Sequence, residues 1–280
     1  PLFRSSAASD VYKRQTLIGL ITIYVIICLV IFLSQRKLLY HPNENNYLDE
    51  NKLTHKIEKV FVKSDNRLIG WYHFKDRKYK TLLFFHGNAG NLQNRIYKLN
   101  EIAELEVNYL IIAYRGFSGN EGKPTEEGLY NDSMAAKRWL NSNNIGDNNI
   151  ILYGESLGTA VAVDLGSKFP FAGIILESPF TSMVELSKIY YPYLPVNLLL
   201  KDRYDSINKI SKITFPKLVM HGDKDNIVPF SMGKRMFESF SEPKFSYFKS
   251  GDDHMMDFDQ ELLGNIENFI NELNLSLIHI

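Results

Sequence analysis

A serine in a glycine-framed turn is the residue of this chain best placed to do chemistry. Residues 154–158 read G-E-S-L-G, with Ser156 at the centre. This turn follows an apolar run at 149–153 that favours a strand and precedes a run at 157–169 that favours a helix. In that context G-x-S-x-G is typical of a nucleophile elbow, which holds a serine hydroxyl at the end of a sheet. A chance match in a strand-to-helix loop is the alternative, because the pattern alone is common.

The serine needs a base, because a hydroxyl is a weak nucleophile until its proton is removed. Around such an elbow the chain order is serine, acid and then histidine, each following the carboxyl end of a strand. Of the seven histidines, only His254 and His279 follow every plausible acid. His279 lies in a terminal segment that we expect to be non-native. We therefore expect His254, in the polar loop 250–254, to be the general base, the alternative being an ordinary histidine on a surface loop.

The acid is expected in the loop 221–229, which follows the apolar run 217–220. Asp223 and Asp225 compete for this role, and Asp225 is favoured because it lies further past the strand and just before an apolar Ile-Val-Pro sequence. Glu177, at the end of the preceding strand, is a third candidate. The acid would orient the imidazole and stabilise the imidazolium that forms during the reaction. A metal site is a weaker interpretation of these loops, since neither supplies a second histidine close by.

Developing negative charge on the substrate oxygen requires hydrogen-bond donors. The backbone N–H of Leu157, directly after the serine, is the first expected donor. The second is the backbone N–H of Asn88, in the glycine-rich loop 86–91 that follows an apolar strand. A phosphate-binding loop is the competing interpretation, but the Lys-Ser/Thr pair of such a motif is missing here. We expect neither a metal nor a cofactor.

Alternating short apolar runs and helix-compatible runs must position these side chains. The alternation predicts an α/β fold, a mostly parallel twisted sheet with helices on both faces. An antiparallel hairpin at 57–62 and 68–73 is expected to precede it. The remaining strands are predicted at 81–85, 109–113, 149–153, 173–176, 217–220 and 244–248, and the helices at 91–105, 125–141, 157–169, 231–239 and 259–273.

The segment 181–212 interrupts the alternation, because it is longer than a simple crossover requires. One interpretation is an ordinary crossover helix with a packed aromatic end. The other is a small cap over the active site that lines an acyl pocket. In the second case we expect the pocket to be lined by Tyr190, Tyr191, Tyr193 and Leu194.

Composition limits the function classes. At 280 residues the chain is long enough for one large domain with a sizeable core. The formal net charge is zero, so nothing favours nucleic acid as a partner. Cys28 is the one cysteine, which excludes an intrachain disulfide.

An uncharged apolar stretch at 16–33 is just long enough to cross a bilayer. We expect an uncleaved single-pass membrane anchor, the alternative being the apolar region of a secretory signal. Residues 1–15 and 275–280 resemble translated sequencing-adaptor sequence and are expected to be non-native. The expected organisation is therefore an anchor at 16–33, a connector at 34–55 and an α/β-hydrolase domain at 56–274, with the cap inserted at about 181–212.

These motifs together carry a family resemblance over about residues 36–274. The matching segments are FHGNAGN (85–91), AYRGFSGNEGKPTEEGL (113–129), YGESLGTAVA (153–162), ESPFTS (177–182), YPYLPVNLLLKDRYDSINKI (191–210) and HGDKDNIVP (221–229). The chain resembles the membrane-anchored α/β-hydrolase-domain family, the group around α/β-hydrolase-domain-containing protein 13. The resemblance implies Ser156 as nucleophile, Asp225 as acid, His254 as base and an N-terminal anchor.

The sequence thus predicts a membrane-tethered serine hydrolase that cleaves a small-molecule or lipid acyl ester through an acyl-enzyme intermediate. A thioester or an amide would serve the same chemistry. A serine aminopeptidase-like hydrolase is the alternative enzyme. A membrane-bound interaction protein without catalytic activity is the alternative from another class.

Overall fold

The computed structural model describes residues 2–43 and 50–275. Within them, eight strands form one sheet in the order β10-β9-β8-β7-β4-β6-β3-β2. The strands are β2 (Glu58–Lys63), β3 (Arg67–His73), β4 (Thr81–Phe85), β6 (Asn108–Ile112), β7 (Ile150–Glu155), β8 (Gly173–Glu177), β9 (Lys217–Gly222) and β10 (Lys244–Lys249). Of the strands expected from the sequence, that at 81–85 has the bounds predicted, and the others differ by one or two residues at their ends.

The sheet is parallel from β6 through β10, and only β2 and β3 run antiparallel to their neighbours. Every residue of β4, β6, β7, β8 and β9 is buried, as expected for parallel strands covered on both faces. The outer strand β2 is buried at only two of its six positions. The predicted fold, a mostly parallel sheet with an N-terminal antiparallel hairpin, is therefore confirmed.

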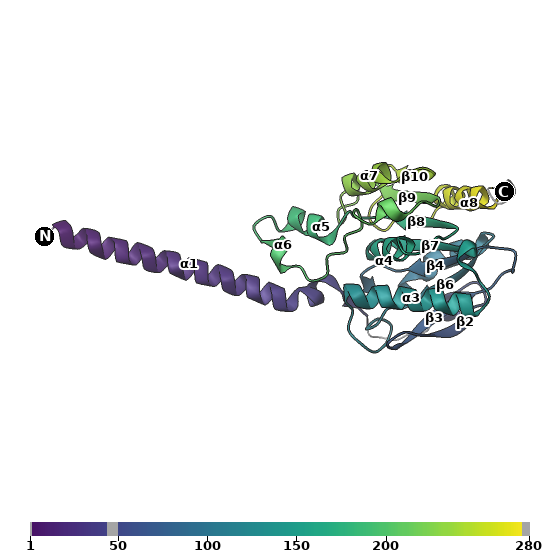
Figure 1. Cartoon of the computed structure of the whole chain (residues 1–280), viewed down its shortest axis with the longest axis horizontal. Helices are drawn as coiled ribbons and strands as arrows, with labels where there is room; N and C mark the ends of the chain where they lie inside the picture. Colours follow the sequence, from purple (N-terminus) through teal and green to yellow (C-terminus); the bar gives the residue numbers. More distant parts are fainter. Residues whose placement is uncertain (1, 44–49, 276–280) are drawn as a thin grey trace.

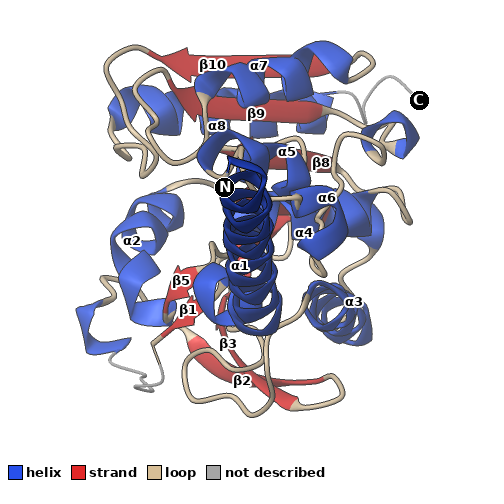
Figure 2. Ribbon diagram, turned by 90° about the vertical axis from the view of Figure 1, so that its left-hand side faces the viewer, coloured by secondary structure: helices blue, strands red, loops and turns tan. Residues whose placement is uncertain are grey.

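Helices cover both faces of the sheet, with α2 on one side and α3 and α4 on the other (Figure 2). Their bounds are α2 (Ile96–Glu104), α3 (Glu126–Ser142), α4 (Leu157–Gly166), α7 (Phe230–Ser239) and α8 (Gln260–Leu275). The helix expected at 91–105 begins instead with a 3₁₀ turn, Leu92–Arg95. Asn91 and Asn94 cap that turn reciprocally through their side chains, which accounts for the later start of α2.

The segment between β8 and β9 forms two short helices, α5 (Met183–Tyr190) and α6 (Val196–Leu199). Ser182 caps α5, because its side chain accepts a hydrogen bond from the backbone N–H of Glu185 at 3.1 Å. We call residues 181–212 the cap. Figure 1 shows α5 and α6 on the side of the body from which the N-terminal helix projects.

The N-terminal helix α1 (Leu2–Leu39) projects away from the body of the molecule (Figure 1). By length and composition, its part from Ser9 to Leu39 could cross a membrane. A signal sequence near the N-terminus would meet the same criterion. The helix continues through residues 34–39, which the sequence suggested as the start of a connector. Gln35 and Arg36 find hydrogen-bond partners in the cap, and these contacts stabilise the last turns.

A second, two-stranded sheet joins the end of α1 to the sheet edge where the site lies. Strand β1 (His41–Pro42) pairs in parallel with β5 (Ala89–Gly90). The backbone N–H of His41 donates to the carbonyl of Asn88 at 2.9 Å. The sequence did not predict these strands, because two residues are too few to show a hydrophobic period.

Candidate active site

Ser156 lies on a strained turn between β7 and α4. Its backbone has φ +51° and ψ −116°, a conformation that non-glycine residues rarely adopt. A Cβ atom at Gly158 would overlap the carbonyl oxygen of Phe85, and one at Gly154 would lie 2.5 Å from a backbone atom of α4. Only glycine fits at either position, so β4 and α4 can approach each other closely. The Ser156 backbone N–H donates to the carbonyl of Glu177 at 2.9 Å, which fixes the turn to β8.

His254 lies in the loop after β10 and contacts both other members of the expected triad. Its Nε2 is 2.9 Å from Ser156 Oγ, and its Nδ1 is 2.7 Å from Asp225 Oδ2. The Ser178 hydroxyl donates to the backbone carbonyl of His254 at 3.1 Å and helps to hold the loop. The structure thus brings together three side chains that are 29 to 98 residues apart in the chain.

The Asp225 carboxylate has no exposed side-chain surface and is held by several donors. Its Oδ1 accepts from the backbone N–H groups of Ile227 and Val228, each at 2.8 Å. Burial by itself raises the pKa of Asp225, but the hydrogen bonds from His221 and His254 lower it well below its ordinary value. The carboxylate is therefore ionised at neutral pH and oriented to accept the Nδ1–H of His254.

His221 also contacts the acid, and sequence reasoning did not find it. Its Nε2 lies 3.0 Å from Asp225 Oδ2 and 3.0 Å from the carbonyl oxygen of Val228. Because both neighbours are acceptors, Nε2 must carry a hydrogen. His221 is fully buried at the end of β9, where a histidine is indistinguishable by sequence from an ordinary core residue. Its position four residues before Asp225 was the available signal.

The two competing acids have other partners. Asp223 is exposed and accepts from the Gly251 N–H at 2.7 Å and the Ser250 hydroxyl at 3.1 Å. Glu177 is buried and accepts from Lys98 Nζ at 2.6 Å and the Tyr153 hydroxyl at 2.6 Å. In the described part of the chain, the carboxylate that contacts His254 Nδ1 belongs to Asp225 rather than to Asp223 or Glu177.

The two expected oxyanion donors belong to segments that contact the serine turn, the start of α4 and the loop 86–91. Leu157 is the first residue of α4, where backbone N–H groups have no partner within the helix. Gly87 lies against the elbow, since a Cβ atom there would be 3.5 Å from Ser156 Cβ. The hydrogen bonds of the described residues include none from the backbone N–H of Asn88 or Leu157. The Asn88 side chain points elsewhere and donates to the carbonyl of Leu39 at 2.7 Å.

A buried cluster of four charged side chains supports the elbow and the loop 86–91. Glu155 binds Arg95 at 2.5 Å and Lys98 at 2.9 Å, and Lys98 also binds Glu177 at 2.6 Å. Burial opposes ionisation of Glu155, but the two cations lower its pKa below the ordinary value. Glu155 also accepts from the backbone N–H of Gly87 at 3.1 Å. The cluster therefore ties the residue before Ser156 to the loop that carries Asn88.

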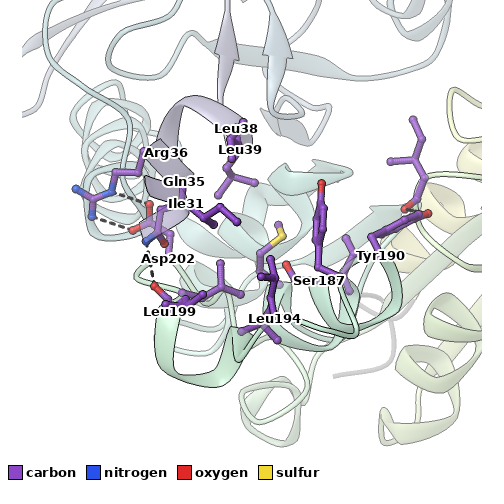
Figure 3. Close-up of a pocket in the computed structure, with 16 residues that line it drawn as sticks. Ile31, Gln35, Arg36, Leu38, Leu39, Ser187, Tyr190, Leu194, Leu199 and Asp202 are labelled. Atoms are coloured by element: carbon purple, nitrogen blue, oxygen red, sulfur yellow. Dashed lines mark hydrogen bonds and ion pairs between the residues drawn. The ribbon is translucent and has the colours of Figure 1, made fainter. Parts of the chain in front are cut away.

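The residues expected to line a substrate pocket divide into two groups. Tyr190, Tyr191 and Leu194 line a cavity of about 280 Å³ between the cap and the end of α1 (Figure 3). Tyr193 lies outside this cavity, with 70% of its surface exposed. Its backbone carbonyl instead accepts a hydrogen bond from the Tyr24 hydroxyl of α1 at 2.8 Å. The turn between α5 and α6 directs this side chain outward.

Within residues 2–43 and 50–275, no three His, Cys, Asp or Glu side chains are grouped so that they could hold a metal ion. His279, the alternative base, lies outside the described residues.

The sequence is similar to a known protein family and to several known proteins. A model of the prolyl oligopeptidase family matches residues 102–260, more than half of the chain. The uncharacterized protein Rv2307c of Mycobacterium tuberculosis is 36% identical over 223 residues, 78% of this chain and 79% of that protein. Human α/β hydrolase domain-containing protein 17B is 37% identical over 186 residues, 66% of this chain and 62% of that protein.

Solved structures agree with this fold. An esterase of Pyrococcus furiosus superimposes with a TM-score of 0.66 at 16% identity, over 84% of this chain and 98% of that one. Est1E of Butyrivibrio proteoclasticus, with ferulic acid bound, gives a TM-score of 0.66 at 18% identity, over 77% of this chain and 99% of that one. The predicted α/β-hydrolase-domain family is confirmed. The chain belongs to the prolyl oligopeptidase family and, with it, to the α/β-hydrolase-domain proteins.

Proposed function

We propose that this protein is a serine hydrolase that cleaves acyl esters with Ser156, His254 and Asp225 as its catalytic triad. The observation that carries the proposal is the unbroken chain of hydrogen bonds from Ser156 Oγ through the imidazole to the buried Asp225 carboxylate. The esterases with the same fold support ester substrates.

In the first half of the reaction, Ser156 Oγ attacks the acyl carbon while His254 Nε2 takes its proton. Negative charge then develops on the carbonyl oxygen, where the N–H groups of Leu157 and Asn88 would stabilise it. The resulting imidazolium is stabilised by the ionised Asp225. His254 then protonates the leaving alcohol, which departs and leaves an acyl group on the serine oxygen.

In the second half, water replaces the alcohol. His254 Nε2 takes a proton from the water as its oxygen attacks the acyl carbon. The imidazolium returns this proton to Ser156 Oγ as the carbon–oxygen bond to the serine breaks. The products are a carboxylic acid and free enzyme, so each atom and proton is accounted for by these residues and one water.

A peptidase is the second candidate, because the matching family model is that of prolyl oligopeptidases. An aminopeptidase needs an uncompensated carboxylate in the site to bind a free amino terminus. The buried carboxylates nearest the elbow, Glu155 and Glu177, are both already bound by Lys98. We therefore favour acyl esters as substrates. Assays with aminoacyl p-nitroanilides beside p-nitrophenyl esters distinguish an aminopeptidase from an esterase.

We also propose that α1 anchors the protein in a membrane. Almost all of the apolar residues between Ser9 and Val30 are exposed in the isolated chain, which a bilayer would cover. Washing membranes with alkaline carbonate should leave the protein in the pellet at its full length. Release of a shorter, soluble form would instead identify α1 as a signal sequence.

A fluorophosphonate probe tests the catalytic proposal, because it reacts only with an activated serine. Wild-type protein should be labelled, and Ser156→Ala should not. The same substitution should lower ester turnover by roughly 10⁴–10⁶-fold, as triad removals do, with the circular dichroism spectrum unchanged. Unlabelled wild-type protein would favour a non-catalytic interaction protein. Retained hydrolysis in the variant would remove Ser156 from the mechanism.

A further inference from the structure

Most of the apolar lining of the cavity comes from α1 and the cap, two parts of the chain that are far apart in sequence. Its apolar lining includes Ile31, Leu38 and Leu39 from α1 and Met183, Leu186 and Leu194 from the cap. The charged and amide side chains at its edge have hydrogen-bond partners within the chain (Figure 3). Arg36 holds Asp202 through two hydrogen bonds, at 2.9 and 3.0 Å. Gln35 donates to the Leu199 carbonyl at 3.0 Å and accepts from the Lys201 N–H at 2.8 Å. An apolar ligand would therefore find no unpaired charge here.

The cavity borders the proposed active site at two places. Leu39, on the α1 wall, accepts a hydrogen bond from the side chain of Asn88 in the oxyanion loop. Ile227 lines the cavity from the other side, only two residues after Asp225. The Tyr190 hydroxyl fixes this side by donating to the Ile227 carbonyl at 2.9 Å. Ser156, Asp225 and His254 do not line the cavity themselves, so a chain lying in it would reach Ser156 by extending past Ile227 and Asn88.

The same region carries exposed apolar side chains next to the proposed anchor. In the cap, Leu198 is 83% exposed and Tyr193 is 70% exposed, and Ile189 and Tyr191 are also exposed. The hydrogen bond from Tyr24 to Tyr193 holds α1 against this surface. Tyrosine beside apolar residues is typical of the membrane interface. The exposed apolar surface of the cap would thus face the bilayer, and the cavity lies directly behind that surface.

We propose that this cavity binds the acyl chain of a single-chain lipid ester, and that the last turns of α1 form one wall of the acyl pocket. The proposal rests on the serine hydrolase function above. At about 280 Å³ the cavity is slightly smaller than the usual ligand pocket of about 300–1,000 Å³, so it suits one chain rather than two. Helix α1 would then be part of the enzyme as well as its anchor.

The test compares p-nitrophenyl esters from acetate to dodecanoate with the full-length protein in detergent micelles. For the wild type, kcat/KM should rise by about fourfold for each added methylene that is buried, until the cavity is full. Leu38→Trp fills the cavity from α1, and Leu186→Trp fills it from the cap. Each should lower kcat/KM for the decanoate by about tenfold or more and leave the acetate within about twofold.

Leu198→Trp is the matched control, since Leu198 lies on the cap surface and does not line the cavity. It should keep the wild-type chain-length profile. Leu38→Trp is the safer of the two filling variants, because Leu38 is 62% exposed and its replacement should not disturb folding. If both filling variants keep the wild-type chain-length profile, or if the wild type has no chain-length preference, the acyl pocket is overturned. The hydrolase function would not be affected by that result. A wild type that neither hydrolyses any ester nor reacts with a fluorophosphonate would instead overturn the hydrolase function.

Discussion

The Asp225 side chain is held in one orientation by its hydrogen bonds. Four donors converge on its carboxylate, two from its own loop and one each from His221 and His254. The loop donors fix Oδ1, while the histidines share Oδ2. Since the carboxylate cannot rotate without losing several of these bonds, it holds the His254 ring with Nε2 directed at Ser156.

Replacing this acid should therefore be far more harmful than replacing its neighbour. Asp225→Asn removes the charge that stabilises the imidazolium and favours the wrong imidazole tautomer, so kcat should fall by about 10⁴-fold. Asp223→Asn is the matched control, because Asp223 only accepts hydrogen bonds from the loop at 250–251, and kcat should stay within about threefold. Steady-state kinetics on one p-nitrophenyl ester measures both. The reverse ranking would show that the acid is Asp223.

At the residue scale, the sequence predicted those side chains that follow strand ends in the order serine, acid, histidine, because the fold requires that order. Ser156, Asp225 and His254 could be selected because each follows a strand end in that order. His221 could not, since its role depends on a contact within a folded loop. Nor could the buried ion cluster, because Arg95, Lys98 and the two glutamates are widely separated in sequence and charged residues normally indicate solvent.

At the scale of elements, the elbow depends on how closely β4 approaches the start of α4. Gly158 allows this approach, because its α-carbon lies against the carbonyl of Phe85. The strained backbone of Ser156 costs of order 1–3 kcal/mol, which the surrounding packing must offset. The ion cluster and the hydrogen bond from Ser156 to Glu177 are part of that support.

A methyl group at Gly158 should push these elements apart. Gly158→Ala should destabilise the protein by several kcal/mol or abolish fluorophosphonate labelling, because the new Cβ would overlap backbone rather than a movable side chain. Gly166→Ala, at the other end of α4, is the control: its Cβ would approach only side-chain atoms, the nearest at 3.2 Å. Its stability should change by less than about 1 kcal/mol. Chemical denaturation measures both, and equal effects would contradict this account of the elbow.

Periodicity predicted the longer elements well, because their burial is set by their own sequence. The run at 81–85 is entirely apolar, and every residue of β4 is buried. Strands β1 and β5 had no such signal. They pair because α1 docks on the cap and so brings residues 41–42 beside the loop 86–91. Such a tertiary contact leaves no mark on the local sequence.

At the scale of the whole molecule, stability should depend on pH through buried histidines. Burial, reinforced by the charge of Arg95, lowers the pKa of His86 to about 3, and burial lowers that of His55 to about 4. An unfolded histidine has a pKa of about 6.5. Below pH 6.5 the unfolded chain therefore binds more protons than the folded chain, and the free energy of unfolding falls as the pH falls.

His86→Asn tests this directly. Asparagine can keep the hydrogen bond that His86 Nδ1 makes to the Gly87 carbonyl, but it does not titrate. Between pH 6 and pH 5, the slope of unfolding free energy against pH should drop by about 1.2 kcal/mol per pH unit relative to wild type. Urea denaturation at several pH values gives the slope. An unchanged slope would mean that His86 is protonated in the folded protein.

The molecule as a whole combines a projecting apolar helix, a cap that contacts it and a sheet edge that carries the proposed triad (Figure 1). Contacts from the last turns of α1 reach both the cap, through Arg36 and Asp202, and the oxyanion loop, through Leu39 and Asn88. The proposed anchor and the proposed triad therefore meet at the same junction, which no single segment of the sequence reveals.

Mass spectrometry of the acyl-enzyme tests the central claim most directly. The protein is mixed with a p-nitrophenyl ester, quenched in acid and digested, and the peptide containing Ser156 is examined. We predict that it gains the mass of the acyl group, that His254→Ala accumulates far less of this adduct, and that Ser156→Ala forms none. An adduct on another residue, or hydrolysis by the wild type with no adduct at Ser156 under any quench time, would contradict the proposed triad.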